Sequence, residues 1–107
     1  MIHVRVKRAG GMISRVTVSG HAGSAPKGED LICSAVSALV QTFYFSLQRL
    51  LQLDVNADVR DGYLSVSIPA EIQAETEAKV ALLANSMLVG LEEIDRSYPG
   101  FLQVSEE

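Results

Sequence analysis

The chain has 107 residues, of which 48% are hydrophobic and 21% charged, and its formal net charge is −4. This length suits one domain over residues 1–107, and the apolar fraction supports a packed core and excludes a disordered chain. The acidic balance argues against nucleic acid as the main partner, because phosphate contacts need concentrated Lys and Arg. A short basic strip is explained more simply as a solvated sheet face (Arg5, Lys7, Arg8 and Arg15).

The cysteine content and one apolar segment bear on the compartment. A single cysteine, Cys33, excludes an intramolecular disulfide, and residues 1–7 lack the apolar core of a signal peptide. We therefore expect a cytoplasmic protein. Residues 31–47 carry no charge and approach the length of a membrane span. Polar residues interrupt this segment, so we interpret it as a buried central helix, or as one that also meets a second subunit, and expect no membrane.

The first elements are predicted to form a β-hairpin. Residues 2–7 and 12–20 alternate apolar and polar side chains, which is typical of strands with one buried face. The expected register pairs inward-facing valines (Val4 with Val18, Val6 with Val16). That register requires an odd-length loop, most simply Gly10-Gly11-Met12.

A loop and a long helix are expected next. Residues 22–29 combine small residues and helix breakers without an apolar anchor, which predicts a mobile loop. Asp30 can cap the following helix. Apolar residues recur at helical spacing from Ile32 to Leu50, so the helix should end near Leu53.

The second half repeats this order. Alternating residues 55–60 and 64–68 flank Asp61-Gly62, a strong signal for a two-residue hairpin loop. Glu71, Glu75 and Glu77 are expected in the early turns of a second helix, which Tyr98-Pro99-Gly100 ends, and residues 101–104 can add a last strand. The order β-β-α-β-β-α-β predicts an α+β sandwich, with a mainly antiparallel sheet and two helices packed on one face.

Reactive side chains gather between His21 and Ser37. If Asp30 caps the helix, Cys33 lies in its first turn, where the dipole and unpaired N–H groups stabilise a thiolate and lower the thiol pKa. Ser37 follows four residues later on the same helical face, and its hydroxyl can donate to or accept from nearby groups. His21 ends the preceding strand, so a nucleophile and a base could meet, which is the minimum for covalent thiol catalysis. Backbone N–H groups at the helix start could serve as oxyanion donors.

Simpler interpretations stay open on residue types alone. A free cysteine is often a small buried hydrophobe, and a histidine at a strand end is often structural. Capping alone would explain Asp30, and a close helix contact would explain Ser37. One cysteine and two distant histidines are too few for a zinc site. Residues 20–28 match no phosphate-binding motif, and acidic residues follow them. We therefore predict no metal and no cofactor.

The segment resembles the signature of the ribosomal-processing cysteine proteases, called Prp, at Gly20, His21, Ala22, Gly28, Asp30, Cys33, Val36 and Ser37. The chain length, the element order and the Asp-Gly hairpin are also similar to that family. The resemblance thus covers essentially the whole chain. One departure is Ser34, where the family pattern has Ala.

This resemblance implies one cysteine protease domain that acts as an endopeptidase. Such an enzyme removes a short N-terminal extension from a large-subunit ribosomal protein, cutting after an aromatic pair and before a small residue. Cys33 would be the nucleophile and His21 the general base, with Asp30 and Ser37 as supporting residues. A substrate loop that orders on binding would include Gly20, Ala22 and Gly28.

The resemblance also implies a homodimer, which suits an apolar second face on the first helix (Leu31, Ala38 and Phe45). The expected partners are the N-terminal segment of a large-subunit ribosomal protein and a second copy of the chain, without direct nucleic acid. The alternative function is a non-catalytic dimeric ribosome-associated module in which His21 and Cys33 only pack. That alternative predicts an inert thiol.

Overall fold

The computed structural model describes residues 1–21 and 30–107. The predicted mobile loop, and with it Ala22 and Gly28, lies outside the described residues. The described elements are β1 (Ile2–Ala9), β2 (Met12–Ser19), α1 (Leu31–Arg49), β3 (Asn56–Arg60), β4 (Tyr63–Ser67), α2 (Ala74–Ser97) and β5 (Leu102–Glu106).

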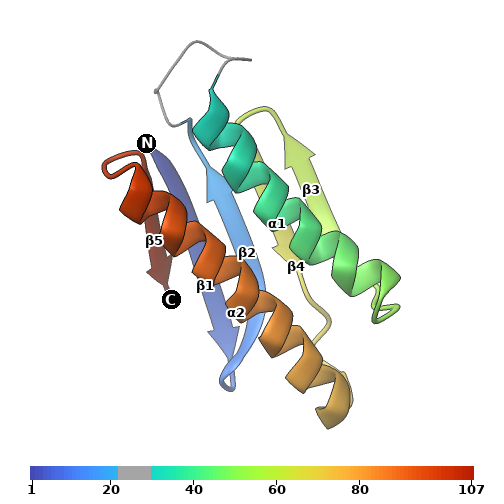
Figure 1. Cartoon of the computed structure of the whole chain (residues 1–107). Coiled ribbons are helices and arrows are strands. Elements are labelled where there is room, and N and C mark those ends of the chain that lie inside the picture. The colour runs from blue at the N-terminus through green and yellow to red at the C-terminus, as the bar shows by residue number, and fades with distance from the viewer. Residues whose placement is uncertain (22–29) are drawn as a thin grey trace.

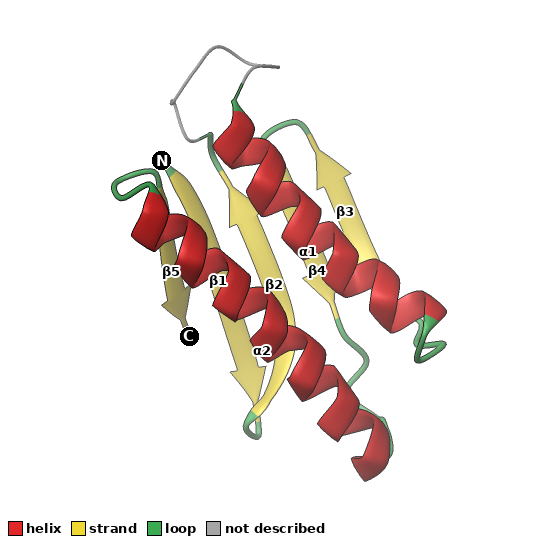
Figure 2. Cartoon of the chain, in the orientation of Figure 1, coloured by secondary structure: helices red, strands yellow, loops and turns green. Residues whose placement is uncertain are grey.

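The described strands form one sheet in the order β3-β4-β2-β1-β5. Strand β5 runs parallel to β1, and the remaining pairings are antiparallel. Both described helices cover the same face of this sheet, as Figures 1 and 2 show. The predicted α+β fold, its element order and the placement of the helices are therefore confirmed.

The core lies between the sheet and the two helices. Val4, Val6, Val16 and Val66 point into it from the strands and are fully buried. Helix α1 is long and apolar enough to cross a membrane by length and composition. Here its apolar stripe packs into the core instead (Ile32, Val36, Val40, Phe43, Tyr44 and Leu47).

The first hairpin has the predicted pairs but a different loop. Val6 pairs with Val16 and Val4 with Val18, yet the three-residue loop is wrong, because Ala9 already pairs with Met12. Gly10 and Gly11 both have positive φ (62° and 85°), as the two-residue type I′ turn requires. A register shift between Lys7 and Arg8 leaves Ser14 as an extra residue in β2. This β-bulge places Val16 opposite Val6, so that both valines face the core.

Both helix boundaries differ from the expectation. Helix α1 ends at Arg49 rather than near Leu53, because Gln52 takes a left-handed conformation (φ 55°) and the Leu53 N–H bonds the Leu47 carbonyl at 3.1 Å. Helix α2 begins after its N-cap Gln73, whose backbone is extended, so Glu71 precedes the helix while Glu75 and Glu77 lie in its first turn.

The second hairpin follows the predicted register. Val59 pairs with Leu64 and Arg60 with Tyr63, which leaves the two-residue loop Asp61-Gly62. Every residue of β3 is exposed, because this strand lies at the edge of the sheet. Figure 1 shows that the turn between β3 and β4 lies beside the start of α1.

Two leucines near the end of α1 offer a matched test of the core. Leu47 is fully buried, whereas Leu50 is 72% exposed. We expect Leu47→Ala to lower the free energy of unfolding by about 2–5 kcal/mol, since it removes methyl groups and leaves a cavity. Leu50→Ala should change it by less than about 0.5 kcal/mol. Urea denaturation of both variants measures the difference, and equal losses would contradict this packing.

Candidate active site

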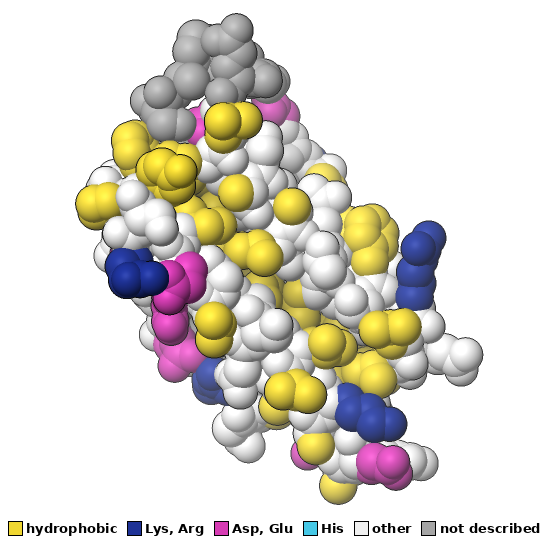
Figure 3. Space-filling model, in the orientation of Figure 1, with side chains coloured by type: hydrophobic (Ala, Val, Ile, Leu, Met, Phe, Trp, Pro, Cys, Tyr) yellow, Lys and Arg dark blue, Asp and Glu magenta, His cyan; other side chains and the backbone are white. Residues whose placement is uncertain are grey.

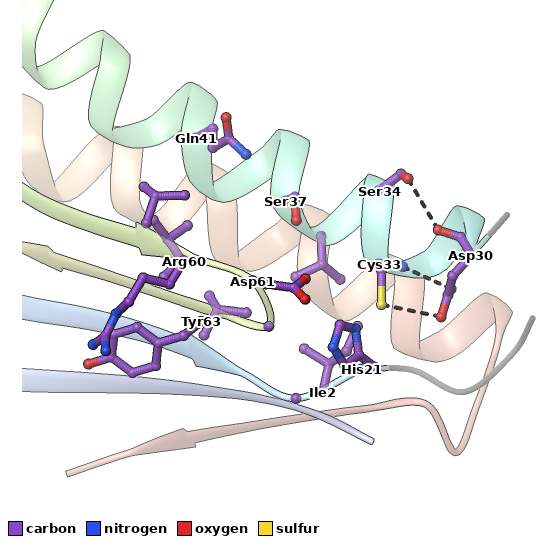
Figure 4. Close-up of a pocket in the computed structure, with 16 residues that line it drawn as sticks. Ile2, His21, Asp30, Cys33, Ser34, Ser37, Gln41, Arg60, Asp61 and Tyr63 are labelled. Atoms are coloured by element: carbon purple, nitrogen blue, oxygen red, sulfur yellow. Dashed lines mark hydrogen bonds between the residues drawn. The ribbon is translucent and has the colours of Figure 1, made fainter. Parts of the chain in front are cut away.

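One end of the sheet, the start of α1 and the β3–β4 turn enclose a cavity of about 580 Å³. This volume lies in the range of ligand pockets, about 300–1,000 Å³. Its lining includes His21, Asp30, Cys33 and Ser37. Figure 4 shows the side chains of His21, Cys33 and Ser37 directed into the space between the sheet end and the helix. The structure therefore brings these four predicted site residues to one pocket.

Asp30 fixes the first turn of α1. As predicted, it is the N-cap, and its Oδ1 accepts hydrogen bonds from the backbone N–H groups of Ile32 and Cys33, both at 3.1 Å. Its backbone carbonyl accepts from both the N–H and the hydroxyl of Ser34, at 3.1 Å each. Asp30 is only 7% exposed, so this cap is a buried carboxylate. The cap thereby sets where the helix begins and where the Cys33 sulfur lies.

The same carboxylate also contacts the candidate nucleophile. The Cys33 thiol donates to Asp30 Oδ2 with a sulfur–oxygen distance of 3.2 Å (Figure 4). The helix dipole favours a thiolate at this position, but a neighbouring carboxylate favours the neutral thiol. Two opposite influences therefore act on one sulfur atom. The sequence predicted Asp30 as a helix cap and a supporting residue, but not its hydrogen bond with the thiol.

His21 is positioned by the glycine before it. Gly20 has φ 89°, and a Cβ there would lie 2.4 Å from the Met1 carbonyl oxygen, so only glycine fits. The Gly20 N–H donates to the Gly62 carbonyl at 3.0 Å, which ties the end of β2 to the β3–β4 turn. The exposed His21 ring then lies against Gly62 at the rim of the pocket.

The backbone N–H groups predicted as oxyanion donors already have hydrogen-bond partners. The N–H groups of Ile32, Cys33 and Ser34 all bond to Asp30 in this structure. They can donate to a substrate only if they share or leave these bonds. In this structure, the N–H groups of the first turn of α1 are therefore used for helix capping.

Sequence reasoning missed the contribution of the second hairpin to this pocket. Arg60, Asp61, Gly62 and Tyr63 line it. The Arg60 guanidinium lies over the Tyr63 ring, 4.6 Å from its centroid, and pairs with Asp58 at 2.9 Å. Asp61-Gly62 was detected only as a turn signal. Nothing local indicates that this turn faces residues some forty positions earlier in the chain.

Apolar side chains form another part of the pocket wall, from Ile2, Val18, Val36, Val59 and Leu64. These residues come from β1, β2, β3, β4 and α1, so the wall exists only in the folded chain. Such a surface suits a hydrophobic side chain of a ligand. Within residues 1–21 and 30–107, no three His, Cys, Asp or Glu residues are grouped to hold a metal ion.

A thiol in the first turn of a helix, with an imidazole lining the same pocket, defines the class of candidate cysteine hydrolases. The comparisons with known proteins agree with that class. The family model "Cysteine protease Prp" matches residues 1–103. The chain belongs to the Prp family of cysteine proteases, and is therefore a hydrolase rather than a non-catalytic module.

Individual relatives are similar over almost their whole length. The ribosomal processing cysteine protease Prp of Bacillus subtilis (strain 168) is 31% identical over 109 residues, which cover 98% of this chain and 96% of the relative. The crystal structure of SMU.848 from Streptococcus mutans has TM-score 0.77 at 29% identity and covers 99% of this chain and 93% of that one. The S. aureus protease Prp, solved with a covalently linked product peptide, has TM-score 0.85 at 22% identity and covers 100% of both chains.

The contact between Asp30 and the thiol leads to a test on the resting protein. Asp30→Asn keeps a side-chain oxygen that can cap the helix, but removes the negative charge beside the sulfur. Because that charge favours the neutral thiol, its loss should raise the thiolate fraction at neutral pH. We expect iodoacetamide to alkylate Cys33 about tenfold faster in this variant.

Asp95→Asn, at an exposed position on α2, is the matched control and should leave the alkylation rate unchanged. Rates are followed by intact-protein mass spectrometry across a pH series. A slower reaction of Asp30→Asn would show that the carboxylate does not restrain the thiol.

Proposed function

We propose that this protein is a cytoplasmic endopeptidase that removes a short N-terminal extension from a large-subunit ribosomal protein. The cut falls after an aromatic pair, and Cys33 and His21 form the catalytic dyad. The observation that carries the proposal is the single pocket that holds the Cys33 thiol at the start of α1 and the His21 imidazole at its rim. The Bacillus subtilis relative, named as a ribosomal processing protease, supports the substrate class.

The reaction begins with the Cys33 sulfur. His21 takes the thiol proton, and the thiolate attacks the carbonyl carbon of the second aromatic residue. The C–N bond then breaks, and the imidazolium of His21 gives its proton to the leaving amine. A thioester remains on Cys33.

Water completes the cycle. Neutral His21 takes a proton from the water molecule that attacks the thioester, and the C–S bond breaks. The products are the new carboxyl end of the extension and the regenerated thiol-imidazole pair. Each step moves one proton through His21 and needs no cofactor.

The walls of the pocket account for the rest of the proposed specificity. The apolar wall of Ile2, Val18 and Val36 can receive an aromatic side chain next to the cut. Ser37 lines the same pocket one helical turn after Cys33, where its hydroxyl can bond a substrate carbonyl. Asp30 holds the resting thiol protonated until His21 or the substrate displaces the bond at Oδ2.

The dyad is tested by two substitutions and a synthetic peptide with an aromatic-aromatic-small sequence. Cys33→Ala should abolish cleavage, because no other side chain in the described pocket supplies a thiol. His21→Ala should lower kcat/KM by about 10²–10⁴-fold, the range for loss of a general base. Mass spectrometry of the products gives both the rate and the cut position.

Far-UV circular dichroism and urea denaturation serve as the control that both variants keep the fold. Cleavage by Cys33→Ala at the parent rate would refute the mechanism. A cut elsewhere than after the aromatic pair would refute the proposed specificity and leave the dyad in place.

We further propose that the protein is a homodimer that associates through the exposed apolar face of α1. Leu31 is 80% exposed and Phe45 is 43% exposed, and Ala38 lies exposed between them. Spacing of seven residues places the three on one side of the helix, opposite the stripe that packs on the sheet. Figure 3 shows the helical layer of the molecule with uncovered hydrophobic side chains. The net charge of −4 agrees with a protein partner rather than direct nucleic-acid binding.

This interface is tested by placing a charge on the proposed surface. Phe45→Glu should convert the dimer to monomer, because a desolvated carboxylate at an apolar interface is costly. Leu82→Glu is the matched control, since Leu82 is 70% exposed on α2 and lies outside the proposed face. Sedimentation velocity measures the mass of each variant. An unchanged dimer in Phe45→Glu would reject this face as the interface.

A further inference from the structure

We propose that Gly62 is a positioning residue for His21. It makes room for the imidazole ring by lacking a side chain, and so holds the ring at the rim of the pocket. The inference rests on the proposed function for the role of His21 as the base. It adds the β3–β4 turn to the machinery that places that base.

The contact between the turn and the ring carries the proposal. A Cβ built on Gly62 would lie 3.0 Å from His21 Nε2, 3.5 Å from Cε1 and 3.7 Å from Cδ2. All three nearest atoms belong to the imidazole, so the bare face of Gly62 is the surface on which the ring lies. Figure 4 shows this ring below the turn that carries Asp61, facing the start of α1.

Backbone bonding makes the contact a fixed one. The Gly62 carbonyl accepts from the Gly20 N–H at 3.0 Å, directly before His21 in the chain. At the next position along, Tyr63 pairs with Ser19 across β4 and β2. The turn and the residue before the ring are therefore held together, and the ring has Gly62 as its neighbour through main-chain geometry.

Other turn glycines show that this contact is separate from turn chemistry. Gly10 has φ 62°, close to the 71° of Gly62, and also lies in a two-residue hairpin loop. A Cβ on Gly10 would meet nothing within 4 Å. Both positions thus need a glycine for their positive φ, but Gly62 alone of the two has a second requirement, imposed by a side chain of the active site.

A methyl group at Gly62 should therefore move the ring rather than break the fold. At 3.0 Å the neighbour must give way by a few tenths of an ångström, and the exposed ring at the end of a side chain can do so. Displacement of a catalytic group by about 1 Å costs on the order of 10²-fold in rate. For the smaller shift here we expect kcat to fall about tenfold, with KM within about twofold.

The experiment compares Gly62→Ala with Gly10→Ala. Urea midpoints should fall equally in the two variants, since both place Ala at a similar positive φ. Peptide kcat should fall only in Gly62→Ala. The imidazole signals of the two histidines, His3 and His21, are followed by NMR and assigned with a His3→Gln variant. The His21 signals should shift in Gly62→Ala and stay unchanged in Gly10→Ala.

The NMR readout needs no substrate, so it separates this proposal from the proposed function. Unchanged His21 signals in Gly62→Ala, or an equal fall of kcat in both glycine variants, would overturn the role of Gly62. Full activity of His21→Ala would instead overturn the dyad, while the NMR signals still decide whether Gly62 places the ring. If Gly62→Ala does not fold, Gly62→Asn takes its place against Gly10→Asn, because Asn tolerates positive φ better than Ala.

Discussion

A single buried carboxylate connects the fold of this protein to its chemistry. Asp30 caps α1 through the N–H groups of Ile32 and Cys33, and its second oxygen accepts a hydrogen bond from the Cys33 thiol. The first set of bonds stabilises the helix and fixes the position of the sulfur. The last bond restrains the same sulfur from ionising. The group that builds the site therefore also keeps it in a resting form, and the cap cannot be changed without altering the nucleophile.

In the proposed mechanism, this arrangement gives His21 a task beyond proton transfer. An imidazolium close to the sulfur would offset the negative charge of Asp30 and favour the thiolate. His21 reaches the pocket from a different part of the chain than Asp30 and Cys33, through Gly20 and the turn at Gly62. In that mechanism, activation of the thiol depends on the placement of His21 by a tertiary contact, whereas its restraint by Asp30 depends on a local one. We therefore expect the enzyme to be inactive unless the end of β2 that carries His21 is correctly placed.

The parts of the fold that follow local rules were predictable from the sequence, and the others were not. Alternation and helical spacing predicted the elements, the valine register and the Asp30 cap, because each depends on neighbours within a few residues. The bulge at Ser14 left no periodic signal. The predicted loop, Gly10-Gly11-Met12, was therefore one residue too long. Roles for His21 and Cys33 came from a family resemblance, since residue types alone left a structural explanation open.

The turn at Asp61 and Gly62 shows most clearly where local reasoning stops. Its dipeptide predicts a hairpin whatever lies around it, so the pattern is explained before any contact is considered. In the folded chain the same turn lines the pocket, bonds the backbone before His21 and supports the ring. A glycine that turn geometry already requires can acquire a second, tertiary role without any change in the sequence pattern. Only a comparison with a glycine of similar φ and open surroundings, such as Gly10, separates the two requirements.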